Sequence, residues 1–319
     1  MAAPRRVAVA ASAGRDSTAL LHCTVRAAVP LGIEVVALHV HHGLMAEADD
    51  WLRQVREQAR RWGAAFDSRR LSGRPGAGES IEAWARAGRY RALAEMAAAA
   101  GCPLVLLAHH RRDQAETWLL QALRGAGPAG LSAMPVQVRR GALQWARPWL
   151  ALPREAIEDY VRRHRLRHAD DPSNDDDRLA RSRLRREVWP ALAAAFPQAE
   201  QALTAAAARA QQAARLAEEV AALDATGVIA GGALSLVPWT ALPPARRRNL
   251  LRAWLADATG QLPPETLLTR LDAELPLPHA RRWPAPGGEL YRHRACLHFT
   301  ATSHAADGEP HIAPSSDPR

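Results

Sequence analysis

The sequence predicts an α/β protein built on a doubly wound parallel sheet, followed by a linker helix and a smaller C-terminal domain. Short apolar runs at 7–11, 33–40 and 103–108 have the length of buried strands. Amphipathic segments separate these runs, and strands that alternate with helices form parallel sheets. In such sheets, ligands bind at the carboxyl ends of the strands. Ser12, His39 and His109 each stand where a predicted strand stops, so we expect a site there.

The predicted helices carry their apolar residues on one side. The helix after the first strand has an inward face of Leu21, Val25, Ala28 and Val29. A helix over 79–100 has an inward stripe of Ile81, Trp84, Ala85, Gly88, Ala92 and Met96. Further helices are predicted over 113–123, 153–164 and 198–223. The expected parts are a catalytic domain at 1–197, a linker helix at 198–226, a small domain at 227–302 and a disordered tail at 303–319.

The composition favours a polyanionic partner. The net charge is +9, and the sequence pI is about 10.8, which suits nucleic acid; a biased genome composition is the alternative explanation. The chain contains no lysine, so arginine supplies all 42 fixed positive charges. Walker-type phosphate loops, pyridoxal Schiff bases and lysine nucleophiles all need that residue. The sequence therefore excludes all three.

The cysteines and the hydropathy pattern favour a soluble protein of the cytoplasm. Cys23, Cys102 and Cys296 lie far apart without a CxxC pair, unlike a disulfide scaffold, a zinc ribbon or a thiolate-held cluster. The first thirteen residues resemble a signal peptide only superficially, because the charged Arg15 and Asp16 follow at once. No stretch approaches the roughly 20 apolar residues of a membrane span. We expect neither a membrane partner nor an obligate protein partner.

A loop after the first strand has the features of a phosphate site. The stretch Ser12-Ala13-Gly14-Arg15-Asp16-Ser17 has little side-chain bulk and leads into a helix N-terminus. Loop amides and the helix dipole both favour an anion there. Asp16 adds a carboxylate that can hold Mg²⁺ against a pyrophosphate. The alternative is an ordinary capped helix with Asp and Ser in its first turn.

A second candidate lies after the third predicted strand. Asp113 and Glu116 are three residues apart and share a helix face. His109 precedes them, and together the three groups can bind Mg²⁺ and move protons. Ordinary N-terminal acids, which the helix dipole favours, are the alternative explanation.

Both stretches resemble known families. The loop is similar to the SGGxDS "PP-loop" of the N-type ATP pyrophosphatases, which have an adenine nucleotide alpha hydrolase-like fold, except that Ala13 replaces the first glycine. If that position needs a positive φ, alanine costs on the order of 1 kcal/mol. The second stretch resembles the hallmark of tRNA(Ile)-lysidine synthases: His109-His110-x-x-Asp113-Gln114-x-Glu116-Thr117, then Arg124-Gly125-x-Gly127-Pro128-x-Gly130-Leu131. The likeness extends to His39-Val40-His41-His42-Gly43-Leu44, Glu82-Ala83-Trp84-Ala85-Arg86, Arg147-Pro148, Asp171-Pro172-Ser173-Asn174 and Arg181-x-Arg183-Leu184-Arg185, with Ser182 where the family usually has Asn.

The resemblance implies a two-step reaction of ATP, free L-lysine and a tRNA(Ile) with a CAU anticodon. The ring carbonyl oxygen of the wobble cytidine attacks the α-phosphate of ATP, and the lysine amine then displaces AMP. Residues 12–17 would bind the phosphates, and Asp16 and Asp113 are the candidate Mg²⁺ ligands. Asp113 and Glu116 would hold metal or the lysine ammonium, and His109 is an alternative base. The candidate phosphate contacts to ATP or tRNA are Arg86, Arg89, Arg181, Arg183 and Arg185.

In the second domain, Arg246, Arg247 and Arg248 are expected to form part of a surface that positions tRNA. The alternatives are a PP-loop tRNA thiolase, a small-molecule ATP-dependent amide synthetase such as NAD or GMP synthetase, and a non-catalytic RNA-binding module. Thiolase chemistry needs well-placed cysteines or a cluster, and Cys23 and Cys102 are expected away from the strand ends that carry the site. A synthetase does not need so basic a second domain. An RNA-binding module leaves Asp113 and Glu116 unexplained.

The cysteines provide a test between the ligase and the thiolase. Replacing Cys23, Cys102 and Cys296 together by Ser or Ala should leave turnover within roughly an order of magnitude of the wild type, because free cysteines act here as small apolar residues. Turnover is measured alongside circular dichroism as a control for folding. A well-folded triple variant without activity would favour the thiolase.

Overall fold

The computed structural model describes residues 5–43, 45–73, 81–169, 180–277 and 282–302, and the chain divides into two compact units, 1–212 and 213–319. Several sequence expectations lie outside the described residues: the start of a helix at Glu79, Leu44, the turn at 170–174, Arg178 and the tail at 303–319. Each unit has its own apolar core. Among the described residues, none of the helices combines the length and the apolar character needed to cross a membrane.

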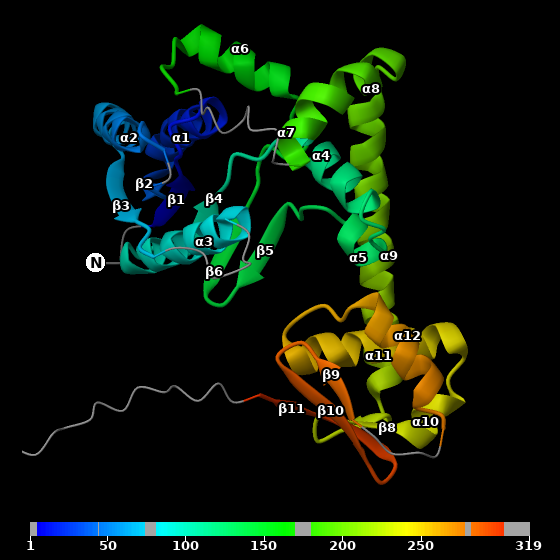
Figure 1. Ribbon diagram of the computed structural model, residues 1–319. Coiled ribbons are helices and arrows are strands. Elements are labelled where there is room, and N and C mark those ends of the chain that lie inside the picture. The colour runs from blue at the N-terminus through cyan, green and yellow to red at the C-terminus, as the bar shows by residue number, and fades with distance from the viewer. Residues whose placement is uncertain (1–4, 44, 74–80, 170–179, 278–281, 303–319) are drawn as a thin grey trace, which may run out of the picture. The chain divides into compact units, whose positions relative to one another are not determined.

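The N-terminal unit contains a six-stranded sheet in the order β3-β2-β1-β4-β6-β5 (Figure 1). Its strands are β1 (Arg6–Ala10), β2 (Glu34–His41), β3 (Ala65–Arg70), β4 (Leu104–Leu106), β5 (Gln137–Arg140) and β6 (Leu143–Ala146). All neighbours pair in parallel except β5, which pairs antiparallel with β6. The predicted parallel sheet is thus confirmed, with one antiparallel strand at its edge.

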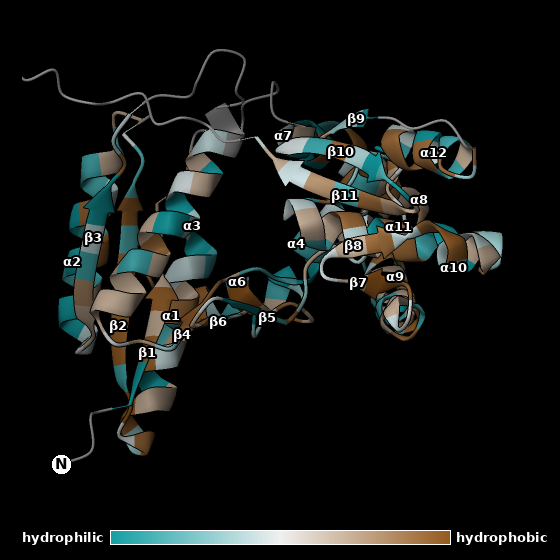
Figure 2. Cartoon of the chain, turned by 90° about the horizontal axis from the view of Figure 1, so that it is seen from below, coloured by the Kyte–Doolittle hydropathy of each residue, from teal (hydrophilic) through white to brown (hydrophobic). Residues whose placement is uncertain are grey.

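Helices cover both faces of this sheet. The helices of the unit are α1 (Arg15–Ala28), α2 (Ala48–Trp62), α3 (Ile81–Ala99), α4 (Arg111–Ala122), α5 (Pro128–Leu131), α6 (Arg154–His164), α7 (Ala180–Arg183) and α8 (Trp189–Ala195). Val7 and Val9 of β1 face the core under α1 and α2, whereas Ala8 between them faces the core under α3. The central strands are therefore buried on both sides, which explains their continuous apolar runs. In Figure 2, β2 is accordingly hydrophobic and the edge strand β3 hydrophilic.

The strand order reverses beside β1. The chain passes from β1 outward to β2 and β3, and then returns to place β4 on the other side of β1. A crevice forms outside the carboxyl ends of strands at such a reversal. The two segments that follow β1 and β4 are the loop into α1 and the loop into α4. The topology thus brings together the two stretches that the sequence singled out.

The sequence expectations needed five corrections. Val29 is 70% exposed, because α1 ends at Ala28 and a 3₁₀ turn, η1 (Val29–Leu31), follows. The third predicted strand is shorter, at Leu104–Leu106. The helix predicted from 113 begins at Arg111. His39 lies within β2 rather than after it. Finally, α2, β3 and the β5–β6 hairpin were not anticipated, since α2 is rich in charge and buries only a narrow stripe, and none of the side chains of β3 is fully buried.

The long helix α9 (Ala199–Ala225) agrees closely with the predicted helix over 198–223. The boundary between the two compact units, at 212 and 213, falls inside it. A π-helical turn, η3 (Leu184–Val188), joins α7 to α8 and lies in the predicted arginine-rich segment.

The C-terminal unit contains a five-stranded antiparallel sheet in the order β7-β8-β11-β10-β9. Its strands are β7 (Ile229–Ala230), β8 (Ala233–Ser235), β9 (Arg282–Ala285), β10 (Gly288–His293) and β11 (Cys296–Ala301). Its helices are α10 (Leu236–Ala241), α11 (Pro244–Thr259) and α12 (Glu265–Glu274). Trp239, Leu255 and Leu271 from the helices pack with Leu290 and Leu297 of the sheet in one core. The unit therefore has two layers, with a sheet on one side and helices on the other (Figure 1).

Candidate active site

The loop between β1 and α1 is closed by the hydroxyl of Ser17. Its Oγ accepts a hydrogen bond from the backbone N of Ser12 at 3.1 Å and donates one to the carbonyl of Gly14 at 3.0 Å. Gly14 is the N-cap of α1 and has extended backbone angles. The first-turn amides of a helix have no intrahelical acceptor. Together with the helix dipole, these amides make the loop a suitable site for a phosphate group.

Ala13 occupies the strained position of this loop. Its φ is 70°, in the left-handed region, and its side chain is fully buried. Its carbonyl accepts hydrogen bonds from Thr18 Oγ1 at 3.2 Å and from the backbone N of Ala169 at 2.9 Å. These contacts hold a conformation that glycine would adopt without strain. Ala13 therefore has the positive φ at which alanine was expected to be less favourable than glycine.

Asp16 is an ionised carboxylate at the start of α1. Arg15 Nε donates to its Oδ1 at 2.9 Å, and the other end of Arg15 reaches Glu158 of α6 at 2.6 Å. Burial raises the pKa of Asp16, but hydrogen bonding and charge from His110 and Arg15 outweigh burial and lower the pKa to about 2. At neutral pH the group carries a full negative charge, which suits a bound cation.

Asp113 and Glu116 lie in the first two turns of α4 and share one guanidinium. Arg185 donates to Glu116 Oε1 at 2.8 Å and to Asp113 Oδ1 at 2.9 Å. Glu116 is 1% exposed, and its second oxygen, Oε2, has no hydrogen-bond partner among the described residues. Arg181 Nε lies 3.7 Å from that oxygen. Arg181 itself donates to Thr117 Oγ1 at 2.6 Å.

His110 joins the loop to the acid helix. Its Nε2 lies 3.6 Å from Asp16 Oδ2 and 3.5 Å from Asp113 Oδ2, and only 3% of the residue is exposed. His110 is the N-cap of α4, and its backbone N donates to Asp113 Oδ2 at 3.0 Å. One imidazole therefore contacts a carboxylate from each of the two sequence motifs. The loop and the acid helix form a single site.

His109 lies beside this site in a different environment. Its Nδ1 is buried and has no hydrogen-bond partner among the described residues. Burial is the main cause that lowers the pKa of His109; Asp113 opposes it, whereas Arg147, Arg181 and Arg86 add to it. The ring is therefore neutral at physiological pH. A neutral imidazole of low pKa is a weak base, so it is poorly suited to take a proton from an alkylammonium group.

Two of the five predicted phosphate-binding arginines reach the acids, and the other three are on the surface. Arg181 and Arg185 contact Glu116 and its neighbours. Arg86, Arg89 and Arg183 are exposed. Arg86 stacks over the Tyr90 ring, with 5.4 Å from its Cζ to the ring centroid. The side chains of Ile81, Glu82 and Ala83 lie outside the described residues.

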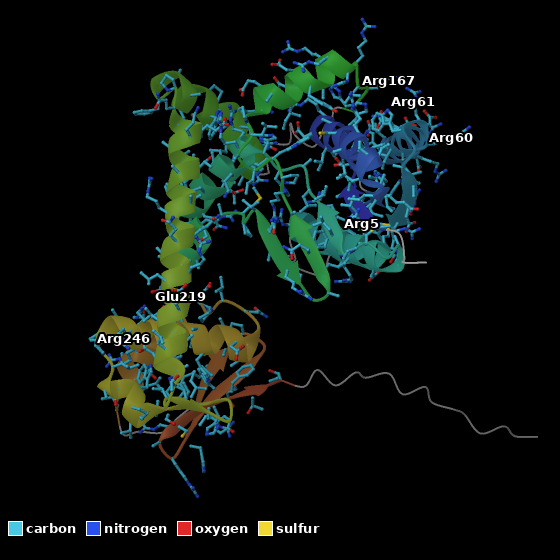
Figure 3. The ribbon with its side chains drawn as sticks, turned by 180° about the vertical axis from the view of Figure 1, so that it is seen from behind. Arg5, Arg60, Arg61, Arg167, Glu219 and Arg246 are labelled. Atoms are coloured by element: carbon cyan, nitrogen blue, oxygen red, sulfur yellow. The ribbon has the colours of Figure 1, made fainter. Side chains whose placement is uncertain are left out.

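A further group of arginines lies at the end of α2 and in the segment after α6. Arg60 and Arg61 close α2, and Arg167 follows α6; all three are exposed, and they lie near one another in Figure 3. Gln58 ties the two segments together by donating to the carbonyl of Arg167 at 2.6 Å. The N-terminal unit therefore has a second basic surface that the sequence motifs did not indicate.

The donor set fits a divalent cation that also binds phosphate oxygens. Asp16 and Asp113 converge on one edge of His110 and provide the oxygen ligands that Mg²⁺ prefers. Within the described part of the chain, no three His, Cys, Asp or Glu side chains are arranged to hold a metal ion by themselves. This is the usual arrangement for Mg²⁺, which keeps few protein ligands and completes its shell with water and phosphate.

Sequence reasoning missed His110, Glu158 and Glu200. His110 was passed over because the helix was predicted to begin at Asp113, which left both histidines in a loop. A start at Arg111 makes Asp113 the third helical residue, whose side chain folds back onto the N-cap residue. Glu158, which anchors Arg15, and Glu200, which accepts from Arg111 and Arg112 at 2.7 Å each, gave no local signal because their partners are distant in sequence.

Two segments of the chain match known protein families. Residues 2–192 match the PP-loop domain family, and residues 234–298 match the TilS substrate binding domain. The first match covers more than half of the chain, so the fold and the loop define a PP-loop protein that uses ATP. The chain is 43% identical over 317 residues to a tRNA(Ile)-lysidine synthase of Ralstonia nicotianae. It is 40% identical over 285 residues to one from Bordetella bronchiseptica. The chain belongs to the tRNA(Ile)-lysidine synthase family.

The matched relatives differ in length. The Ralstonia alignment covers 98% of this chain and 67% of the relative, and the Bordetella alignment covers 87% and 83%. A relative from Burkholderia mallei is 46% identical over 253 residues, which are 78% of this chain and 51% of that protein. The chain thus spans between about half and most of the length of these relatives.

A solved structure supports the fold. The U34-tRNA thiolase of Methanococcus maripaludis, whose structure contains a [4Fe-4S] cluster, aligns with a TM-score of 0.55 at 13% identity, over 65% of this chain and 72% of that one. In this chain, Cys23 lies on α1, Cys102 precedes β4 and Cys296 begins β11. Burial raises the pKa of the Cys102 thiol, which makes it less reactive. The likeness to the thiolase is therefore one of fold.

The strained Ala13 yields a prediction for stability. Ala13→Gly should change the free energy of unfolding by less than about 1 kcal/mol, because relief of the left-handed strain is offset by the lost methyl group and by backbone entropy. Ala13→Val should lower it by more than about 2 kcal/mol, since a β-branched residue disfavours this backbone. Chemical unfolding of the three proteins measures both effects. A valine variant as stable as the wild type would show that the loop has a different backbone.

Proposed function

We propose that the protein is an ATP-dependent carbon–nitrogen ligase that joins free L-lysine to the wobble cytidine of the CAU-anticodon tRNA(Ile), in the cytoplasm. The products are lysidine, AMP and pyrophosphate, and the tRNA changes from reading AUG to reading AUA and from methionine to isoleucine identity. The observation that carries the proposal is the contact of His110 with both Asp16 and Asp113. It supports one site in which an ATP loop faces acids suited to an amine.

In the first step, the ring carbonyl oxygen of the cytidine attacks the α-phosphate and pyrophosphate leaves. The amides around residues 12–17 stabilise the charge that develops on the leaving pyrophosphate. Asp16 and Asp113 would hold Mg²⁺, which supplies positive charge to the phosphate oxygens. Arg15 keeps Asp16 in place through its second contact with Glu158.

In the second step, the lysine amine attacks the adenylated base and AMP leaves. The ammonium must lose a proton before it attacks. Glu116 Oε2 is our candidate acceptor, because the other oxygen of Glu116 and both oxygens of Asp113 already accept hydrogen bonds. Arg181 approaches that oxygen at 3.7 Å. When Arg181 turns to a phosphate of the tRNA or of ATP, the amine takes its place.

Arginine side chains would make the contacts to the tRNA phosphates. The exposed Arg86, Arg89 and Arg183, with Arg60, Arg61 and Arg167 on the second basic surface, provide charge for phosphates without reading sequence. The reaction as proposed needs ATP, lysine and tRNA and no further protein.

A direct assay tests the proposal with the wild-type protein. Incubation with ATP, Mg²⁺, radiolabelled lysine and total tRNA should place label in tRNA(Ile) with a CAU anticodon and leave tRNA(Met) unlabelled. Label without ATP, or no label in any tRNA, would contradict the proposed ligation.

Two variants in the same assay separate the steps. Asp16→Asn should reduce tRNA-dependent ATP–pyrophosphate exchange at least a hundredfold, because Mg²⁺ at the phosphates would lose a carboxylate ligand. Glu116→Gln should retain exchange within about tenfold but lose lysine incorporation, since only the second step uses that oxygen. Asp50→Asn on the surface of α2 is the matched control. An equal loss of exchange in both variants would show that Asp16 and Glu116 do not act in separate steps.

A further inference from the structure

The C-terminal sheet has one face outside the apolar core. Leu290 and Leu297 point into the core under the helices, as does Trp283 of β9. Because side chains alternate along a strand, their neighbours point to the opposite face. The pairing register places Arg282, Tyr291 and His298 side by side in one row across β9, β10 and β11.

Aromatic rings lie together on this face. Tyr291 and His298 stack, with centroids 5.1 Å apart and planes 15° from parallel. His293, two residues along β10, approaches His298 edge-on at 6.4 Å. Tyr291 and His298 are half-buried and His293 is exposed, and none of the three belongs to the core of the unit. Flat rings presented in this way form a platform on which a nucleobase can stack.

The hairpin that carries the platform has an arginine in a strained position. Arg294, between β10 and β11, has a φ of 53° and is exposed. Glycine or asparagine is usual at such a turn position, since residues with larger side chains are strained there. Among the described residues no ion pair of Arg294 is found. A positive charge therefore stands at the tip of the hairpin where the local fold would favour a smaller residue.

The three consecutive arginines of α11, which the sequence predicted to contact tRNA, form ion pairs within the C-terminal unit. Arg246 pairs with Asp224, Arg247 with Asp272 and Arg248 with Glu265. These guanidiniums link α11 to α9 and α12 inside the unit, as Figure 3 illustrates for Arg246 beside α9. On the sheet face, Glu289 pairs with Arg282, and it is the one acid beside the platform in the part of the chain that the structure describes. The unbalanced positive charge thus lies on the sheet side.

We propose that this face, defined by Arg282, Tyr291, His293, Arg294 and His298, binds unpaired nucleotides of the tRNA. A base stacks on the Tyr291–His298 pair, and Arg294 contacts a neighbouring phosphate. Unpaired nucleotides are the expected partner, because the bases of a duplex are stacked on each other and not free to meet the rings. The proposal rests on tRNA being the substrate, as proposed above, and assigns its contact to one face of the C-terminal unit.

The test measures tRNA binding by the full chain across a salt series. Tyr291→Ala should weaken binding about tenfold, whereas Tyr291→Phe should stay within about twofold because it keeps the ring. Arg294→Gly should weaken binding severalfold and make the salt slope shallower by about one, the share of one phosphate contact. Its melting temperature should not fall, since glycine relieves the strained φ. A loss of binding without a loss of stability separates this effect from unfolding.

Two controls decide the outcome. Arg252→Gln removes the same charge from the helical layer, where Arg252 pairs with Glu265, and should leave the salt slope unchanged. A fully double-stranded RNA should bind Tyr291→Ala as well as it binds the wild type. If Tyr291→Ala and Arg294→Gly bind tRNA like the wild type, or if Arg252→Gln loses as much as Arg294→Gly, the proposal is wrong. If the wild type forms no lysidine while Tyr291→Ala still loses tRNA affinity, the proposed function fails and the assignment of this surface stands.

Discussion

One imidazole connects the two halves of the site. His110 caps α4 and places its Nε2 against Asp16 from the loop after β1 and Asp113 from the helix after β4. Parallel strands on either side of a topological reversal bring these segments near each other, but only to within the width of the crevice. The shared histidine sets their final separation. The positions of the phosphate site and of the acids both depend on this contact.

Charge balance is the second constraint on the site. Asp16, Asp113 and Glu116 are three largely buried carboxylates, and Arg15, Arg181 and Arg185 accompany them. Unpaired carboxylates in such a place would be costly, because burial disfavours the charged form. The guanidiniums therefore act as partners that a cation or an ammonium group can replace. Since the chain contains no lysine, no ε-amine of the protein competes with the substrate amine of the proposed reaction.

The sequence predicted most of the N-terminal sheet because its central strands are apolar on both faces. It failed at α2, which buries a narrow stripe, at β3, whose side chains are at most partly buried, and at the hairpin of β5 and β6. The loop and the acid helix were recognisable as local motifs with fixed spacing. Contacts between distant segments were not, so the pairing of Arg185 with both acids and the role of His110 emerged only in three dimensions. Likewise, the sequence predicted that Arg246 forms part of a basic surface, whereas in the fold Asp224 neutralises its charge.

The contact between His110 and Asp16 can be measured directly through the carboxyl group of Asp16. Carbon NMR of the side chain, followed through an acid titration, reports its pKa in the wild type and in His110→Asn. We expect a pKa of about 2 in the wild type, and a higher value in the variant, because burial raises this pKa and His110 opposes it. An unchanged pKa in a folded His110→Asn variant would show that the imidazole does not join the loop to the acid helix.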